Sequence, residues 1–488
     1  MELELVADAD KVAGLGRWKP LAASRNGRPR TQPVKIIWHD SPDHALLEDG
    51  LTLAEQRGVR RLERVVPGMD TWLPGQPVPV LGDADPLPSP LAPLAAFEGR
   101  QTVSVHQLGD QPVTVTVAKG SLRAVTAEQP AARIWLSGEE QAVRAMAMLL
   151  AEAVPITVPV ASLAAEGIAL ATGRAAAWRR QGAPLLPQGT PDGGVLGATD
   201  AAAHVLGHLT DVILACAAEV VRQHGDAPEA VHQLRVAVRR ARSALSIFRP
   251  ALPAGALDTV GARLRELGRR LGPTRDWDVF VGETAPVIQH ALPDDPRLQR
   301  LLGAASRRRQ AYRKELTAFL DSAAFRALGI ELAWFAAAGF WRMPPSGDGG
   351  AEAEPPVLGD FAAAVLQRRW KKLVVLGRRI EELDVASLHR VRLRAKRARY
   401  AAEVFSTLYQ GRVAGRFIRR LSVLQQRLGV LNDGAVATHL LAELGGPSGR
   451  HGYATGVVAG FLAARAEKIR PRIIRAFEKF RRQPVHWA

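Results

Sequence analysis

At 488 residues the chain is too long for one ordinary hydrophobic core, so two or three domains are expected. Hydrophobic residues make up 47%, as in a globular protein, and the one cysteine, Cys216, excludes a disulfide framework within the chain. A reducing compartment fits this cysteine usage, and the acidic N-terminus lacks the layout of a signal peptide. We therefore expect a soluble cytoplasmic protein.

The net charge of +17 is distributed unevenly along the chain. Residues 1–190 carry 19 Lys and Arg against 20 Asp and Glu, so the rest holds 46 basic and 28 acidic residues. Such asymmetry favours a polyanionic partner for the C-terminal part, namely nucleic acid, a membrane surface or another polyphosphate. A generally arginine-rich composition is the plainer alternative.

Residues 1–178 are expected to form a β domain, because short alternating runs are separated by turn-forming residues. The expected strands are Glu2–Val6, Lys35–His39, Gly58–Val66, Arg100–Val105 and Val113–Val117. Helices are expected at Gln141–Ala151 and Val160–Ala171, and the proline-rich segment Pro67–Pro93 is expected to be an irregular loop. The longest apolar region, Ala145–Ala171, contains two prolines and two glutamates, so we expect no membrane span there.

Residues 179–198 are rich in glycine and proline and are expected to be an interdomain linker. From residue 199 to the end nearly every segment is predicted to be helical. Two helical repeats are expected, at 199–341 and 357–482, with Arg342–Pro356 as the seam between them. Each repeat has room for about four helices, and two four-helix bundles related by approximate two-fold symmetry are the expected architecture. The predicted fold class is thus multidomain α+β, with an N-terminal antiparallel β-barrel-like domain followed by an all-α domain.

One helix, Val231–Phe248, carries a regular ladder of cations. His232, Arg235, Arg239 and Arg242 lie at i, i+3, i+7 and i+10, so they share one face. Like charges on adjacent turns repel one another and weaken a helix, so this face needs an anion or abundant water around it.

The same pattern recurs 157 residues later, in Leu388–Phe405. The second ladder contains His389, Arg392, Lys396, Arg397 and Arg399, which correspond to His232, Arg235, Arg239, Arg240 and Arg242. The offset also relates Gly272 to Gly429 and Asp276 to Asp433. A constant offset over such a length marks an internal repeat.

Guanidinium forks match phosphate oxygens, and a row of them at helical spacing suits a repeating anion. Arg240 and Arg397 lie off the main face and could serve a neighbouring groove or solvent. Additional candidates come from basic clusters elsewhere, for which a solvated helix face is the favoured alternative. These additional candidates are Arg270, Arg309, Arg313, Lys372, Arg420 and Arg427.

His232 and His389 each open a ladder, so a phosphate-facing role is favoured over a packing or capping role. A metal role is less favoured, because no ligand partner stands at suitable spacing. For Asp276 and Asp433, which lie four residues after a glycine, we expect helix N-caps following a helix stop. Pinning of nearby arginines is the alternative. We find no catalytic nucleophile, phosphate-binding loop or zinc signature.

The duplicated helices closely resemble the CHAD family, the conserved histidine α-helical domain, across about residues 199–482. The resemblance implies a doubled helical bundle that binds inorganic polyphosphate on a basic surface and associates with polyphosphate granules. By position it implicates the eight face residues His232, Arg235, Arg239, Arg242, His389, Arg392, Lys396 and Arg399.

Residues 1–178 resemble, in outline, a CYTH domain, the triphosphate-tunnel β-barrel. Glu2 and Glu4 match the first positions of its E-x-E-x-K strand, and Arg133–Gly138 and Ala164–Gly167 resemble two later segments. The region Trp38–Leu53 resembles its Y-x-D-T-x-D and L-x-L-R segments.

The departures from that pattern fall on the chemistry of the tunnel. The expected cations are replaced by Val6, Ala54 and Gln56, and the expected metal-binding acids by Ala132 and Ile134. A site that holds triphosphate and a divalent metal needs those groups. We therefore expect a degenerate domain without triphosphatase activity.

Together these observations predict a non-enzymatic polyphosphate-binding protein that needs no cofactor and no metal. A metal-dependent triphosphatase or polyphosphatase and a nucleic-acid-binding protein are the alternatives; the ladders lack interleaved aromatics for stacking bases. The N-terminal domain could recruit a protein partner. We expect no membrane association, and a cytoplasmic location at polyphosphate granules.

Overall fold

The computed structural model describes residues 2–65, 87, 90–159, 161–173, 184–187, 195–252, 255, 257–337, 357–409 and 411–487. The expected seam Arg342–Pro356 and most of the expected linker and proline-rich loop lie outside these residues. The chain divides into two compact units. Unit 1 comprises 1–181, Leu206–Ala218 and Phe319–Phe340, and unit 2 comprises Gly182–Val205, Glu219–Ala318 and Trp341–Ala488.

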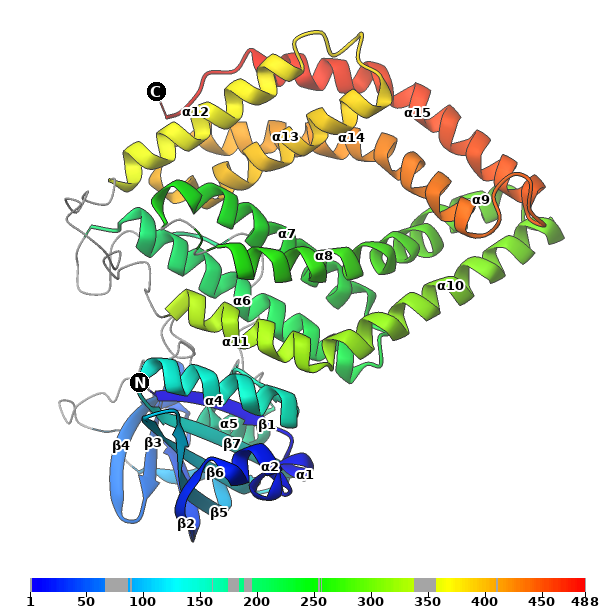
Figure 1. Ribbon diagram of the computed structural model, residues 1–488. Helices are drawn as coiled ribbons and strands as arrows, with labels where there is room; N and C mark the ends of the chain where they lie inside the picture. The colour runs from blue at the N-terminus through cyan, green and yellow to red at the C-terminus, as the bar shows by residue number, and fades with distance from the viewer. Residues whose placement is uncertain are drawn as a thin grey trace. The chain divides into compact units, whose positions relative to one another are not determined.

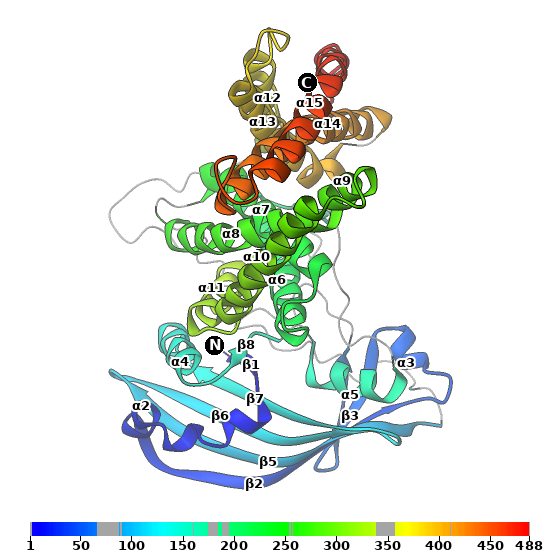
Figure 2. The ribbon, with the colours of Figure 1, turned by 90° about the vertical axis from the view of Figure 1, so that its right-hand side faces the viewer.

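Unit 1 is built on one eight-stranded antiparallel sheet in the order β4-β3-β2-β5-β6-β7-β1-β8 (Figure 2). The strands are β1 Glu2–Ala7, β2 Arg25–Asp40, β3 Leu51–Gln56, β4 Val59–Arg64, β5 Ala92–Leu108, β6 Gln111–Arg123, β7 Glu128–Gly138 and β8 Ile156–Thr157. The expected antiparallel β domain is confirmed. The sheet has two edges, β4 and β8, and no pairing among the described residues closes it into a barrel.

The long strands β5 and β6 form the centre of this sheet and are joined by a tight turn. Gly109 in that turn has φ 60°, a conformation that glycine adopts without strain. Gly99 and Gly120 face each other across the two strands. A Cβ on either glycine would collide with the backbone of the other strand, so the close approach depends on both.

Helices cover one part of the sheet. They are α1 Ala9–Val12, α2 Lys19–Ala23, α3 Ala45–Glu48, α4 Glu140–Ala153 and α5 Leu163–Thr172. The expected helices at Gln141–Ala151 and Val160–Ala171 correspond to α4 and α5. Gly167 on α5 lies against the ring of Trp38, where a Cβ would approach within 2.8 Å.

A helix from the expected first helical repeat also belongs to unit 1. Helix α11, Ala323–Ala337, packs on α4, and the indole Nε1 of Trp334 donates to Glu140 Oε1 at 3.0 Å. The guanidinium of Arg326 donates to the carbonyl of Ala151 at 2.7 Å. Residues 319–340 therefore cluster with the sheet, although sequence repetition assigned them to the helical half.

The C-terminal part is helical, as expected (Figure 1). Before the seam lie α6 Ala198–Arg222, α7 Pro228–Phe248, α8 Asp258–Val279, α9 Ala285–Ala291 and α10 Pro296–Leu320. After it lie α12 Leu358–Leu376, α13 Val385–Val404, α14 Arg412–Glu443 and α15 Gly452–Arg481. Approximate symmetry between the halves stays a prediction.

The expected helix stops at Gly272 and Gly429 are wrong. Helix α8 continues through Gly272 and Pro273 to Val279, where a π-helical turn, Phe280–Thr284, leads directly into α9. Helix α14 continues through Gly429 for 32 residues. Burial of one face of each helix supplies the stability that local propensity lacks. Asp276 and Asp433 are therefore interior helical residues and not N-caps.

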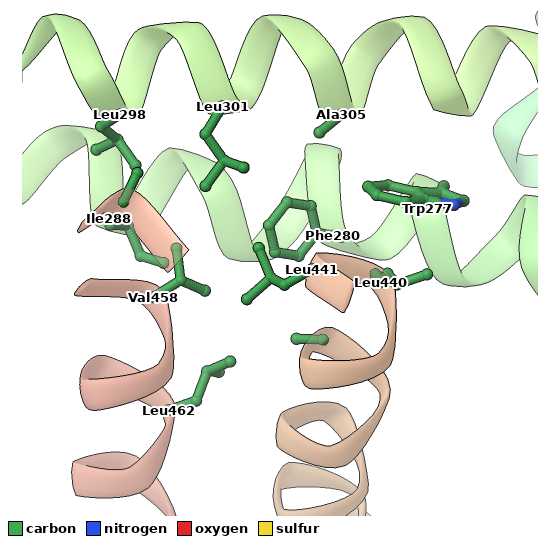
Figure 3. Packing of buried hydrophobic residues seen from close by; sticks show 12 residues of the cluster. Trp277, Phe280, Ile288, Leu298, Leu301, Ala305, Leu440, Leu441, Val458 and Leu462 are labelled. Atoms are coloured by element: carbon green, nitrogen blue, oxygen red, sulfur yellow. The ribbon is translucent and has the colours of Figure 1, made fainter. Parts of the chain in front are cut away.

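Two packed regions join the halves within unit 2. In the first, Phe248 and Phe405, which occupy equivalent repeat positions, meet edge to face with centroids 6.0 Å apart. The second is a cluster in which residues of α8, the π-turn, α9 and α10 meet residues of α14 and α15 (Figure 3). Trp277, Phe280, Leu440 and Leu441 belong to it, and each is at most 2% exposed.

Helix α6 alone among the described helices has the length and apolar content to cross a membrane. Half of its apolar window is buried inside the protein, as in the core helix of a soluble protein, so this is weak evidence for a span.

Candidate functional site

The ladder helix α7 is held by a buried stripe on its opposite side. Val231, Leu234, Val238, Leu245 and Phe248 are all buried, so the helix presents its cationic face away from this core. Helix α13 is held in the same way by Leu388, Val391, Ala395 and Ala398. The amphipathic period of the two repeats thus fixes where their cations point.

A pocket of about 180 Å³ opens between α7, α8, the π-turn, α13 and α14. We call it the central pocket. Its lining combines cations, carboxylates and a few apolar side chains: His232, Arg235, Val236, Arg239, Arg275, Asp276, Val279, Phe280, Thr284, Arg392, Asn432, Asp433, Val436, Ala437 and Leu440. The structure therefore brings together Arg235 and Arg239 of the first ladder with Arg392 of the second.

Asp276 pins an arginine of the first ladder. Arg235 Nη1 donates to Asp276 Oδ1 at 2.6 Å and to the carbonyl of Gly272 at 3.2 Å. The equivalent pair in the second repeat, Arg392 and Asp433, are electrostatic neighbours as well. Pinning, the alternative to an N-cap, is thus what the structure contains. A fixed guanidinium loses less freedom when an anion binds.

Lys396 lies close to the positive charges that line the central pocket. Burial, followed by the charges of Arg239 and Arg392, lowers the pKa of its ammonium group from 10.5 to about 6. The pKa of Arg392 is lowered for the same leading reason, partial burial. These groups form an electropositive region whose repulsion Asp433 relieves only in part.

The two histidines lie in different surroundings. His232 lines the central pocket, and burial together with the charge of Arg275 lowers the pKa of its imidazole. The ring is therefore neutral at pH 7 and can both donate and accept hydrogen bonds. His389 is exposed and is not among the residues that line the central pocket.

The later rungs of the ladders join α7 to α13. Arg240 Nη2 pairs with Glu403 Oε2 at 3.2 Å, and Arg399 Nε lies 3.4 Å from Glu403 Oε1. Arg239 Nε donates to the hydroxyl of buried Tyr400 at 2.5 Å. The guanidinium groups of Arg239, Arg240 and Arg399 all lie within 6 Å of the Tyr400 ring centre. Arg239 and Arg240 thus hold α7 against α13, whereas Arg399 pairs with Glu403 within α13.

Lys372 and Arg397 line a second depression, of about 600 Å³, between α12 and α13. We call it the outer groove. Its other lining residues are Lys371, Val375, Leu376, Arg390, Leu393 and Arg394. Arg242 is exposed, and its pKa is lowered by partial burial and then by the charges of Arg265 and Arg397.

The remaining additional candidates have structural partners. Arg309 Nε and Arg313 Nη2 reach Asp278 Oδ1 at 2.7 and 2.8 Å, and the Asp278 side chain is 1% exposed. Arg270 pairs with Glu266 at 2.8 Å. Arg420 and Arg427 donate to the carbonyls of Lys479 and Arg472 at 2.8 and 2.7 Å.

Sequence reasoning missed Arg275, Asn432, Val279 and Val436 as pocket residues. The signal was present, because the 157-residue offset relates Arg275 to Asn432 and Val279 to Val436. The repeat therefore extends through the pocket wall. Glu403 and Tyr400 carry no such signal, since their partners on α7 lie about 160 residues away in sequence.

Two carboxylates of unit 1, those of Glu4 and Glu166, share one arginine as an ion-pair partner. Arg133 Nε lies 3.0 Å from Glu4 Oε1, and its Nη2 lies 2.8 Å from Glu166 Oε1. The Arg133 side chain is 1% exposed, so it is fixed between both acids. Within the described residues no group of three His, Cys, Asp or Glu side chains could hold a metal ion.

A family model described as the CHAD domain matches residues 204–442. The crystal structure of the CHAD domain from the plant Ricinus communis is similar, with 29% sequence identity and a TM-score of 0.48. That alignment covers 60% of this chain and 95% of that chain. PptA from Streptomyces chartreusis shares 18% identity with a TM-score of 0.43, over 58% of this chain and 100% of that chain. No curated protein matches the chain.

Proposed function

We propose, from the premise that residues 204–442 of this chain are a CHAD domain, that the domain binds inorganic polyphosphate in the central pocket. The observation that carries the proposal is the convergence of Arg235, Arg239 and Arg392, from two duplicated helices, on one pocket. Guanidinium groups recognise phosphate oxygens through paired donors. A ligand with repeated phosphates meets cations from both repeats at once.

The charges at the pocket support an anionic ligand. Asp276 is already paired with Arg235 and Glu283 with Arg275, so the remaining pocket cations, Arg239 and Arg392, exceed the remaining carboxylate, Asp433. Lys396 becomes a further cation whenever an anion stabilises its protonated form. Partial burial strengthens each of these interactions relative to open solvent.

Nucleic acid is the less favoured ligand. Proteins that bind single strands stack bases on exposed aromatic rings. The aromatic ring that lines the central pocket, Phe280, is 2% exposed, and Tyr400 is covered by arginines.

Binding without catalysis is part of the proposal. Glu4 and Glu166 in unit 1 are engaged by Arg133, which disfavours a divalent metal at these acids. We further propose that the protein resides in the cytoplasm at polyphosphate granules, and that unit 1 recruits a protein partner. Co-localisation of the tagged protein with stained granules tests the first point; a diffuse signal in granule-rich cells would contradict it.

Calorimetry with polyphosphate at several salt concentrations tests the function. The variant Arg235→Gln with Arg392→Gln should lose at least tenfold in affinity, because a hydrogen bond to a charged group contributes about 1.5–3 kcal/mol. The control, Arg416→Gln with Arg419→Gln, removes two exposed arginines of α14 that do not line the pocket. Equal losses in both variants would mean that only net charge matters. Tighter binding of RNA than of polyphosphate would favour the alternative ligand.

A further inference from the structure

The outer groove is a concentration of positive charge. Five of its eight lining residues are cations, and none is acidic: Lys371, Lys372, Arg390, Arg394 and Arg397. Among the residues that the structure describes, no ion pair joins any of these five side chains to a carboxylate. Arg390 donates to Ser387 Oγ at 2.9 Å and is an electrostatic neighbour of Asp384, but none of the five has a close ion pair like that of Arg235 with Asp276 among these described residues.

The groove uses a different face of α13 from the ladder. Arg390, Leu393, Arg394 and Arg397 are spaced i, i+3, i+4 and i+7, which makes a continuous stripe. Its apolar members are unusually open to solvent, since Val375 is 59% and Leu393 37% exposed. Walls of low polarity lined by charges of one sign focus the electrostatic field into a groove.

Only the second repeat carries this stripe. The 157-residue offset relates Arg390, Leu393, Arg394 and Arg397 to Gln233, Val236, Ala237 and Arg240. The first repeat thus has one cation where the second has three, and Arg240 is engaged by Glu403. The basic stripe of the outer groove is therefore specific to the second repeat and is not part of the duplicated pattern.

The groove adjoins the first ladder. Arg397 is an electrostatic neighbour of Arg242, which lies one turn beyond Arg239 on α7. Arg369 bridges the same place, donating from Nη1 to the carbonyl of Arg397 at 2.8 Å and from Nη2 to Ser246 Oγ at 3.4 Å. Positive charge thus continues from the central pocket along α7 to the outer groove.

We propose that the outer groove is a second binding segment for the polyphosphate chain, so that long chains contact both the central pocket and the groove. The inference rests on the proposed function and adds a dependence on chain length to it. A second contact made by a tethered ligand raises the overall affinity without any change at the first site. Short chains that fill only the central pocket gain nothing from the groove.

The test compares tripolyphosphate with long-chain polyphosphate on the full-length protein. Arg390→Gln with Arg394→Gln should leave tripolyphosphate affinity unchanged and weaken long-chain binding several-fold. It should also lower the slope of log affinity against log salt by about two for long chains, one for each cation removed. Arg416→Gln with Arg419→Gln is the matched control for charge, and circular dichroism checks the fold.

The outcomes separate the two proposals. If the groove variant binds long chains as tightly as the wild type at low salt, while Arg235→Gln with Arg392→Gln weakens both ligands, the groove is no binding segment and the function stands. Weaker RNA binding with unchanged polyphosphate binding in the groove variant would also overturn the inference. Failure of the wild type to bind either polyphosphate would remove the proposed function and the inference with it.

Discussion

The folded protein disfavours the protonated form of Lys396. Its pKa of about 6 arises from burial and from the neighbouring charges of Arg239, Arg392, Arg235 and Arg399. The free protein therefore holds Lys396 mostly neutral at pH 7. A bound phosphate favours the ammonium form and raises this pKa again, so binding takes up a proton.

We therefore expect polyphosphate affinity to rise as the pH falls from about 8 towards the pKa of about 6, and to level off below it. Long polyphosphate chains are used as the ligand, so that protonation of their terminal phosphates contributes little to the measured pH dependence. Calorimetry in buffers of different ionisation enthalpy measures the proton uptake directly. Lys396→Met should flatten the profile, and a profile unchanged by this substitution would show that another group titrates.

The same residue should destabilise the unliganded fold. In the unfolded chain Lys396 binds its proton below pH 10.5, whereas in the fold it does so only below about 6. Its contribution to stability is thus lost progressively as the pH falls from 10.5 to 6. Lys396→Met should raise Tm at pH 7; a gain of about 1 kcal/mol corresponds to roughly 2–4 °C. A lower Tm would contradict this.

Asp278 should behave as a buried anchor. Its carboxylate holds both Arg309 and Arg313, so Asp278→Ala leaves Arg309 without its anion and Arg313 with only the exposed Asp226. We expect a loss of about 3–5 kcal/mol in the free energy of unfolding. Glu266→Ala, which removes a more exposed partner of Arg269 and Arg270, should cost at most about 1 kcal/mol. Denaturant titration compares the two, and similar losses would contradict the assignment.

Single residues differ in how far their roles follow from sequence. Arg235, Arg239 and Arg392 could be predicted as site residues because the duplication repeats their type and spacing. Arg240 follows the same pattern, yet a tertiary contact directs it to Glu403 on α13. No local rule contains that partner, whereas the pairing of Arg399 with Glu403 is a local i,i+4 contact.

Among whole elements, the helices of both repeats and most strands follow from periodicity and turn signals. Their ends follow less well, as α8 shows by continuing through Pro273. Proline disfavours a helix interior locally, but long-range burial of Leu264, Leu267, Leu271 and Trp277 on the same helix outweighs that cost. The barrel closure expected from the resemblance also depends on long-range pairing, which strand patterns alone do not specify.

Helix α11 provides a test of which unit it belongs to. Trp334 is 2% exposed and donates to Glu140 on α4, so Trp334→Ala should destabilise unit 1 by about 3–5 kcal/mol. Trp334→Phe keeps most of the burial and loses the hydrogen bond, at a cost of about 1 kcal/mol. Hydrogen exchange measures the effect on α4. Unchanged protection of α4 in Trp334→Ala would separate α11 from unit 1.

At the scale of the whole molecule, the domain boundary after residue 178 and the start of a separate helical domain at residue 199 stay predictions. The clustering of residues 206–218 and 319–340 with the sheet bears on both. These two segments join unit 1 through tertiary contacts between residues that are distant in sequence, so composition and linker signals do not predict the assignment.

Charge balance in unit 1 gives a prediction about metals. Because Arg133 already pairs with both Glu4 and Glu166, a chelator should leave the stability of this unit unchanged. Arg133→Met should leave the two acids facing each other, and Mg²⁺ or Mn²⁺ should then raise Tm for the variant alone. Stabilisation of the wild type by either metal, measured by thermal shift with chelator as the control, would contradict this.

The Arg133 bridge implies that the stabilities of the two units depend differently on a bound anion. In unit 1 the cation that pairs with Glu4 and Glu166 is Arg133 of the same chain, so these ion pairs form when the unit folds and need no ligand. On the proposed function, Lys396 stays surrounded by the positive charges of Arg239 and Arg392 until polyphosphate binds. When polyphosphate is scarce, the free energy of unfolding of the helical unit should therefore fall, whereas that of the sheet should stay the same.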